Sequence, residues 1–136
     1  SDTMIKQRLN KARRVLEVQQ DLQRLEEVRV AGLRSRQAEI AASREELVAT
    51  LSNEAMPRQL LLDAIVRRLK SLSEEEVKVA KELERRSELL RQHASRAKCA
   101  ERRSRDYEQQ DAKARADKEL QEVVDRVGRP GDASLR

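Results

Sequence analysis

The sequence predicts an all-α protein, a long antiparallel two-helix coiled-coil hairpin whose second helix is longer than its first. Composition, sparse helix-breaking residues and apolar periodicity support this prediction. The 136 residues include no Phe or Trp, one Tyr, three Gly and two Pro, and 40% of them are charged. Compact cores draw on aromatic rings and β-rich folds need Gly and Pro at their turns, so neither class fits. Abundant Ala, Leu, Glu, Arg, Lys and Gln is instead typical of long helices that pack along a narrow seam.

Helix-breaking residues indicate one turn between two helices. Pro57 is the first proline in the chain, and it follows a polar stretch at 52–56, a combination that ends one helix and opens the next. Gly128 and Pro130 then stop the second helix. We therefore expect one hairpin over residues 1–127 and a disordered tail at 128–136, with helices at about 3–53 and 57–127 and a turn near 53–57.

Apolar periodicity predicts the contact face of each helix. Alternate steps of three and four from Leu62 follow a heptad seam along the second helix to Tyr107. The same steps along the first helix give a seam of Ile5, Arg8, Ala12, Val15, Gln19, Leu22, Glu26, Arg29, Leu33, Arg36, Ile40, Ser43, Leu47 and Thr50. A second row that includes Leu9 and Leu16 broadens the apolar face near the N-terminus, which indicates a further partner there.

One antiparallel register satisfies both the charges and the apolar pattern of the two seams. When the fold-back is centred on Met56, Glu26 faces Arg86 and Arg36 faces Glu76. A shift by one heptad sets seam charges against hydrocarbon, at a cost of about 3–5 kcal/mol for each mispaired charge. We therefore predict that these two pairs fix the register. The alternative is that the long side chains extend to water and match by chance.

Positive charge gathers in two segments of the chain. The net charge is +5; residues 1–14 hold five cations and one acid, and residues 91–105 hold six cations and one acid. The antiparallel register brings both segments to the open end of the hairpin, which favours an acidic protein partner. Two other interpretations are an ordinary solvated helix surface and nucleic-acid binding. Nucleic acid is disfavoured because stacking aromatics are lacking and acids such as Glu17 lie close by.

The second helix extends beyond the start of the first helix in the antiparallel register. Beyond Tyr107 the first helix has no residues left to cover an apolar stripe that includes Leu120 and Val124. An uncovered stripe of this kind indicates oligomerisation or insertion into a groove, whereas a frayed terminus is the alternative. We expect a monomer or a weak dimer, and a generic coiled-coil scaffold is the second function that the pattern allows.

Chemical sites are not indicated by the residue types present. Three glycines form no phosphate-binding loop, and His93 and Cys99, each the sole residue of its type, cannot build a zinc site. No apolar run approaches the roughly 18 residues of a membrane span or forms a signal peptide, and a lone thiol fits a reducing compartment. We expect a cytoplasmic, non-enzymatic protein with no catalytic residue, cofactor or metal, which binds proteins and not nucleic acid.

Two segments of the chain resemble a known family. KARRVLEVQQDLQRLEE (11–27) and ERRSRDYEQQDAKARADKELQEVVDR (101–126) are similar to the opening and closing segments of the stalk proteins of bacterial type III export systems. These are the flagellar FliJ family and its injectisome counterpart, the YscO family. The likeness covers most of the chain and includes its size, the early start of the first helix, the single hairpin and the longer basic second helix.

The resemblance implies a set of partners and contact residues. Family members associate with a hexameric export ATPase through the terminal parts of both helices, contact the export gate and bind export chaperones, at the periphery of the inner-membrane export apparatus. Carried over, the ATPase side would consist of Lys11, Arg13, Arg14, Arg102, Arg103, Arg105, Leu120 and Val124. The gate side would consist of Leu60, Leu61 and Val66.

Overall fold

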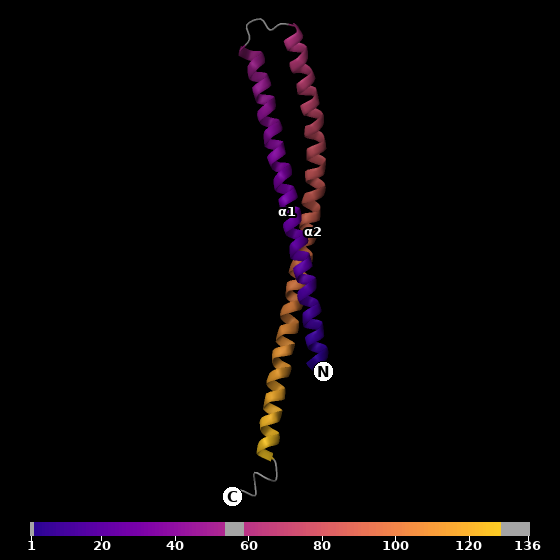
Figure 1. Cartoon of the computed structure of the whole chain (residues 1–136), viewed down its shortest axis with the longest axis vertical. Coiled ribbons are helices and arrows are strands. Elements are labelled where there is room, and N and C mark those ends of the chain that lie inside the picture. The colour runs from indigo at the N-terminus through magenta and orange to yellow at the C-terminus, as the bar shows by residue number, and fades with distance from the viewer. Residues whose placement is uncertain (1, 54–58, 129–136) are drawn as a thin grey trace. The chain divides into compact units, whose positions relative to one another are not determined.

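A computed structural model describes residues 2–53 and 59–128 of the chain. Helix α1 runs over Asp2–Asn53 and helix α2 over Gln59–Gly128, and these two ranges contain no strand (Figure 1). The predicted fold class, an all-α pair of contacting helices with the longer one second, is confirmed. Gly128 belongs to α2, although we expected the tail to begin there. The expected turn at 54–57, the expected start of the second helix and the tail from 129 onward lie outside the described residues.

Local interactions along both helices suit their solvated surfaces. Near the end of α1, the Thr50 hydroxyl donates to the carbonyl of Glu46 at 2.9 Å and the Ser52 hydroxyl donates to that of Val48 at 3.0 Å. Each hydroxyl bonds back to the carbonyl four residues earlier on its own helix, which satisfies its hydrogen-bonding group without a partner from another element. Along α2, arginines pair with glutamates three or four residues away, which supports an exposed helix surface.

The chain divides into two compact units. The terminal unit consists of Ser1–Asp21 and Ala94–Arg136, and the middle unit consists of Leu22–His93. In the terminal unit the indigo start of α1 lies beside the orange part of α2 (Figure 1). In the middle unit Glu26 pairs with Arg86 and Arg44 pairs with Glu76. Rising numbers on α1 therefore meet falling numbers on α2, as antiparallel packing requires.

Burial on α2 follows the predicted heptad seam. Every predicted seam residue from Leu62 to Tyr107 is buried or half-buried. The largest fully buried side chains of the middle unit are Leu72 of α2 and Ile40 of α1, each 1% exposed. The predicted register places these two residues opposite each other, and the burial of both agrees with that placement.

On α1 four of the fourteen predicted seam positions were wrong by one residue. Ten predicted positions are buried or half-buried, and the exposed ones are Arg8, Val15, Arg29 and Thr50. At each of these four the next residue is buried or half-buried instead, namely Leu9, Leu16, Val30 and Leu51. Leu9 and Val30 thus take the places that the prediction gave to Arg8 and Arg29, both of which are exposed. The physical reason is that rotating α1 slightly about its axis buries two aliphatic side chains and leaves two guanidinium groups in water.

The end of the covered seam on α2 also differs from the prediction. Asp111 is 2% exposed and Ala114 is half-buried, although we expected nothing of α1 to lie beyond Tyr107. Because α1 starts at Asp2, the antiparallel register sets its first turn beside Asp111. Residues 115–128 are all exposed, with Leu120 63% and Val124 54% exposed.

Candidate functional site

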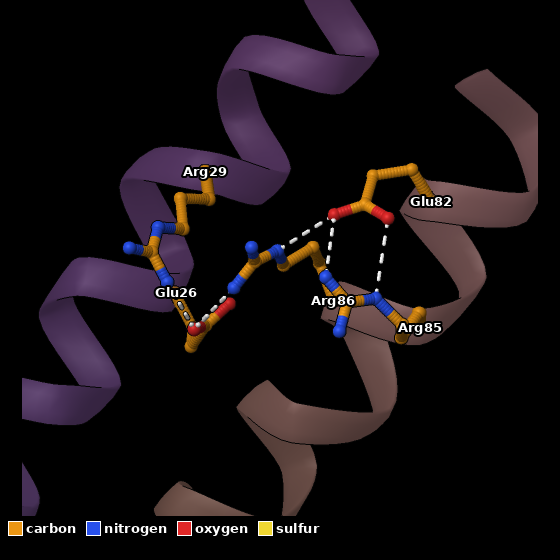
Figure 2. Close-up of polar contacts among 5 residues, drawn as sticks. All are labelled: Glu26, Arg29, Glu82, Arg85 and Arg86. Carbon is orange, nitrogen blue, oxygen red and sulfur yellow. Dashed lines mark hydrogen bonds and ion pairs between the residues drawn. The ribbon is translucent and has the colours of Figure 1, made fainter. Parts of the chain in front are cut away.

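A buried carboxylate joins the two helices of the middle unit. Glu26 is 4% exposed, and its Oε1 accepts hydrogen bonds from Arg86 Nη1 at 3.0 Å and from Arg29 Nη1 at 2.9 Å (Figure 2). Its Oε2 is buried and accepts no hydrogen bond. The predicted pair of Glu26 and Arg86 is therefore present as a contact between α1 and α2. Any change that removes Arg86 leaves a buried negative charge with a single cation beside it.

Arg86 also links Glu26 to a second carboxylate on its own helix. Arg86 Nε donates to Glu82 Oε1 at 2.9 Å, and Arg85 reaches both oxygens of Glu82 (Figure 2). Hydrogen bonds from Arg85 and then Arg86 lower the pKa of Glu82 below its ordinary value. The stabilisation from this ionised carboxylate is complete above its pKa in the unfolded chain. It is lost as pH falls through the lower pKa of the folded chain.

The second predicted pair, Arg36 with Glu76, was wrong in its partners. Arg36 Nε donates to Glu75 Oε1 at 2.8 Å and Arg36 Nη1 donates to Glu39 Oε2 at 2.9 Å. Glu76 instead binds Arg44 at 2.5 Å. Arg36 and Gln37 are both half-buried, so Arg36 lies at the edge of the seam, within reach of Glu75. Both pairs are substantially exposed, so they stabilise the register less than Glu26 and Arg86 do.

The terminal unit contains a groove between α1 and α2. Its volume is about 520 Å³. The groove is lined by Arg8, Lys11, Ala12, Val15, Gln19, Ser95, Arg96, Cys99, Ala100, Arg103 and Tyr107. Both basic segments of the sequence contribute to it, since its four cations come two from each helix. No carboxylate lines it.

The four cations of the groove, like Arg14 and Arg102 outside it, are unpaired within the described residues. Arg8, Lys11, Arg96 and Arg103 are exposed, and none forms an ion pair with the described residues. Outside the groove, Arg13 pairs with Glu108 at 3.4 Å and Arg105 pairs with Glu101. Four unneutralised cations on one groove favour an anionic ligand.

A second buried carboxylate lies further along the terminal unit. Asp111 Oδ2 binds Arg115, while the buried Asp111 Oδ1 accepts no hydrogen bond. The hydrogen bond that Arg115 donates to the Asp111 carboxylate raises the pKa of Arg115 above its ordinary value. The heptad step from Tyr107 leads to Asp111, and this step could have revealed the position in the sequence.

The residues assigned to the ATPase side fall into three groups. Lys11 and Arg103 line the groove, Arg13 and Arg105 are occupied by ion pairs, and the remaining residues are exposed outside the groove. That last group consists of Arg14, Arg102, Leu120 and Val124. The proposed gate-side residues, Leu60, Leu61 and Val66, are all exposed in the middle unit.

Of the eleven groove residues, the sequence assigned only Lys11 and Arg103 to a binding surface. Arg8 and Tyr107 were predicted in the seams, and Arg96 contributed only to the charge of its segment. A signal was available for Arg96, because Arg96 and Arg103 are one heptad apart and so share a helix face. For Arg8 the deciding factor is the rotation of α1.

Comparisons with known proteins do not assign a family. No protein-family model, curated protein or solved structure matches the chain. Within residues 2–53 and 59–128, no group of three His, Cys, Asp or Glu side chains is placed to hold a metal ion. Neither described helix contains a segment apolar enough to cross a bilayer.

Proposed function

We propose that this protein is a non-enzymatic stalk or adaptor of a bacterial type III export apparatus, flagellar or injectisome. It binds the hexameric export ATPase through the terminal unit and links the ATPase to the export gate and to export chaperones, at the cytoplasmic side of the inner membrane. The resemblance of segments 11–27 and 101–126 to export stalk proteins suggests the system, and the terminal unit supports the contact.

The observation that carries this proposal is the combination of two features in the terminal unit. Unneutralised cations line a groove there, and the uncovered end of α2 exposes Leu120, Val123, Val124 and Val127. Cations attract an acidic surface and set the rate of encounter, whereas apolar side chains stabilise the complex once it forms. Several exposed apolar side chains close together on one helix segment mark a protein contact.

The test is the effect of the purified chain on its cognate export ATPase. We expect the chain to promote ring assembly or ATP hydrolysis, and Arg102→Glu with Arg103→Glu to weaken binding by about tenfold or more because two attractive charges become repulsive. Arg67→Glu with Arg68→Glu is the matched control, since it reverses an exposed arginine pair on the same helix in the middle unit. The proposal would be contradicted if the chain changed neither assembly nor ATP hydrolysis of the ATPase, or if both double variants lost the same amount of binding affinity.

A generic scaffold that self-associates is the second candidate, and the uncovered end of α2 favours it. If two copies pair antiparallel so that Leu120 faces Val123 of the second copy, Lys118 then faces Asp125 of that copy. Sedimentation distinguishes the candidates: a dimer that is lost on Leu120→Ser and persists in the presence of the ATPase favours the scaffold.

A further inference from the structure

The groove of the terminal unit has an apolar floor between two basic walls. Ala12 and Ala100 are buried at its base, and Val15 adds an exposed aliphatic side chain. Arg8 and Lys11 stand on the α1 side, and Arg96 and Arg103 stand on the α2 side. A ligand that fills this space therefore needs an apolar face flanked by negative charge on both edges.

The dimensions of the groove suit a helix. Its lining on α1 extends from Arg8 to Gln19, which at 1.5 Å per residue is about 16 Å, or roughly three helical turns. Small residues such as Ala12 and Ala100 allow a third helix to approach both helices closely. Such a helix would cover apolar surface that a pair of helices leaves in water.

We propose that this groove binds an acidic amphipathic helix of a protein partner, which becomes the third helix of a local three-helix bundle. The partner helix presents small or aliphatic residues to Ala12, Ala100 and Val15. Its Asp or Glu side chains, on both flanks of that apolar stripe, pair with the four cations of the groove. The inference goes beyond the export function, because it follows from the chemistry of the groove and holds for any helical partner.

Nucleic acid fits the groove less well than a helix does. A single strand binds through stacking platforms placed along a basic track, and the groove offers one aromatic ring, Tyr107. Its alanine and valine floor would face polar sugars and phosphates, which gain nothing from apolar contact.

Cys99 provides a native probe of occupancy, because the lone thiol of the chain is exposed and lines the groove. The experiment measures the alkylation rate of Cys99 in the full chain, with and without a synthetic amphipathic peptide of about 18 residues. The peptide helix has leucine and alanine on one face and glutamate on both flanks of that face. We expect saturating peptide to slow alkylation about tenfold, and a peptide with lysine flanks to leave the rate unchanged. Protection by both peptides, or by neither, would overturn the proposal.

Charge reversal in the groove supplies the second arm of the experiment. Arg8→Glu with Arg103→Glu is expected to raise the dissociation constant of the glutamate-flanked peptide by about tenfold or more. Lys6→Glu with Lys98→Glu has the same change in charge at exposed positions outside the lining, and we expect a change of about twofold or less. Circular dichroism establishes that both variants keep their helices. Equal losses in both variants would overturn the proposal, because they would show attraction to net charge alone.

Two further outcomes would identify a different occupant and so overturn the proposal. One is protection of Cys99 by a single-stranded oligonucleotide where the glutamate-flanked peptide gives none. The other is a concentration-dependent dimer of the full chain that the Arg8→Glu, Arg103→Glu variant abolishes, since a second copy would then fill the groove. No ATPase is present in these assays, so their failure is distinct from failure of the export proposal.

Discussion

Replacing Leu72 with alanine is expected to lower the free energy of unfolding by about 2–5 kcal/mol. Leu72 is 1% exposed, as is Ile40, and the register sets the two opposite each other. Removing the leucine side chain loses its transfer free energy and leaves a cavity that two stiff helices cannot close. Urea unfolding followed by circular dichroism measures the change.

Val66→Ala is the matched control for Leu72→Ala. Val66 is on the same helix but exposed, so alanine there removes little packing and has the higher helix propensity. We expect its free energy of unfolding to change by less than about 0.5 kcal/mol. If Leu72→Ala were as mild as Val66→Ala, the middle unit would not be packed along this seam.

Arg86→Met is expected to lower the free energy of unfolding by about 3 kcal/mol. Methionine keeps an unbranched apolar stem but removes the guanidinium group whose charge neutralises Glu26. The carboxylate of Glu26 is buried and would retain only Arg29, which is on its own helix. Thermal or urea unfolding of the full chain measures the loss.

Two further variants separate burial from charge at this position. Arg85→Met removes the neighbouring arginine, whose pair with Glu82 is exposed, so we expect it to lower the free energy of unfolding far less than Arg86→Met does. The double variant Glu26→Leu with Arg86→Met replaces a buried ion pair by apolar side chains and is expected to restore the stability of the parent chain or exceed it. A double variant as unstable as Arg86→Met alone would show that Glu26 is not the cause.

Much of the fold could be predicted because composition and the spacing of apolar residues determine local helix formation and the buried face of each helix. Chains rich in Ala, Leu, Glu and Arg form helices wherever they lack Gly and Pro, and the seam of α2 has a single apolar row to bury. On α1 two adjacent rows compete, one through Val15 and one through Leu16. Periodicity does not decide between them, because the rotation of a helix depends on the packing of its partner.

The same limit explains what was missed in the candidate site. Sequence predicted that the two basic segments meet, and both contribute to the groove. It did not predict which cations line the groove, because moving the seam by one residue exchanges Arg8 for Leu9, nor that Arg36 reaches Glu75 in place of Glu76. Long arginine side chains also reach neighbouring carboxylates, so spacing gives their partners only to within a residue.

Both the proposed function and the basic groove depend on the antiparallel register of the terminal unit. Oxidative cross-linking of Ala12→Cys with Ala100→Cys tests this register most directly, in a chain where Cys99 is replaced by serine. Both alanines are buried in the groove, so we predict a disulfide within one chain, while Ala12→Cys with His93→Cys, shifted by one heptad, stays reduced. A disulfide between two chains, or preferential closure of the shifted pair, would contradict the register and the groove built on it.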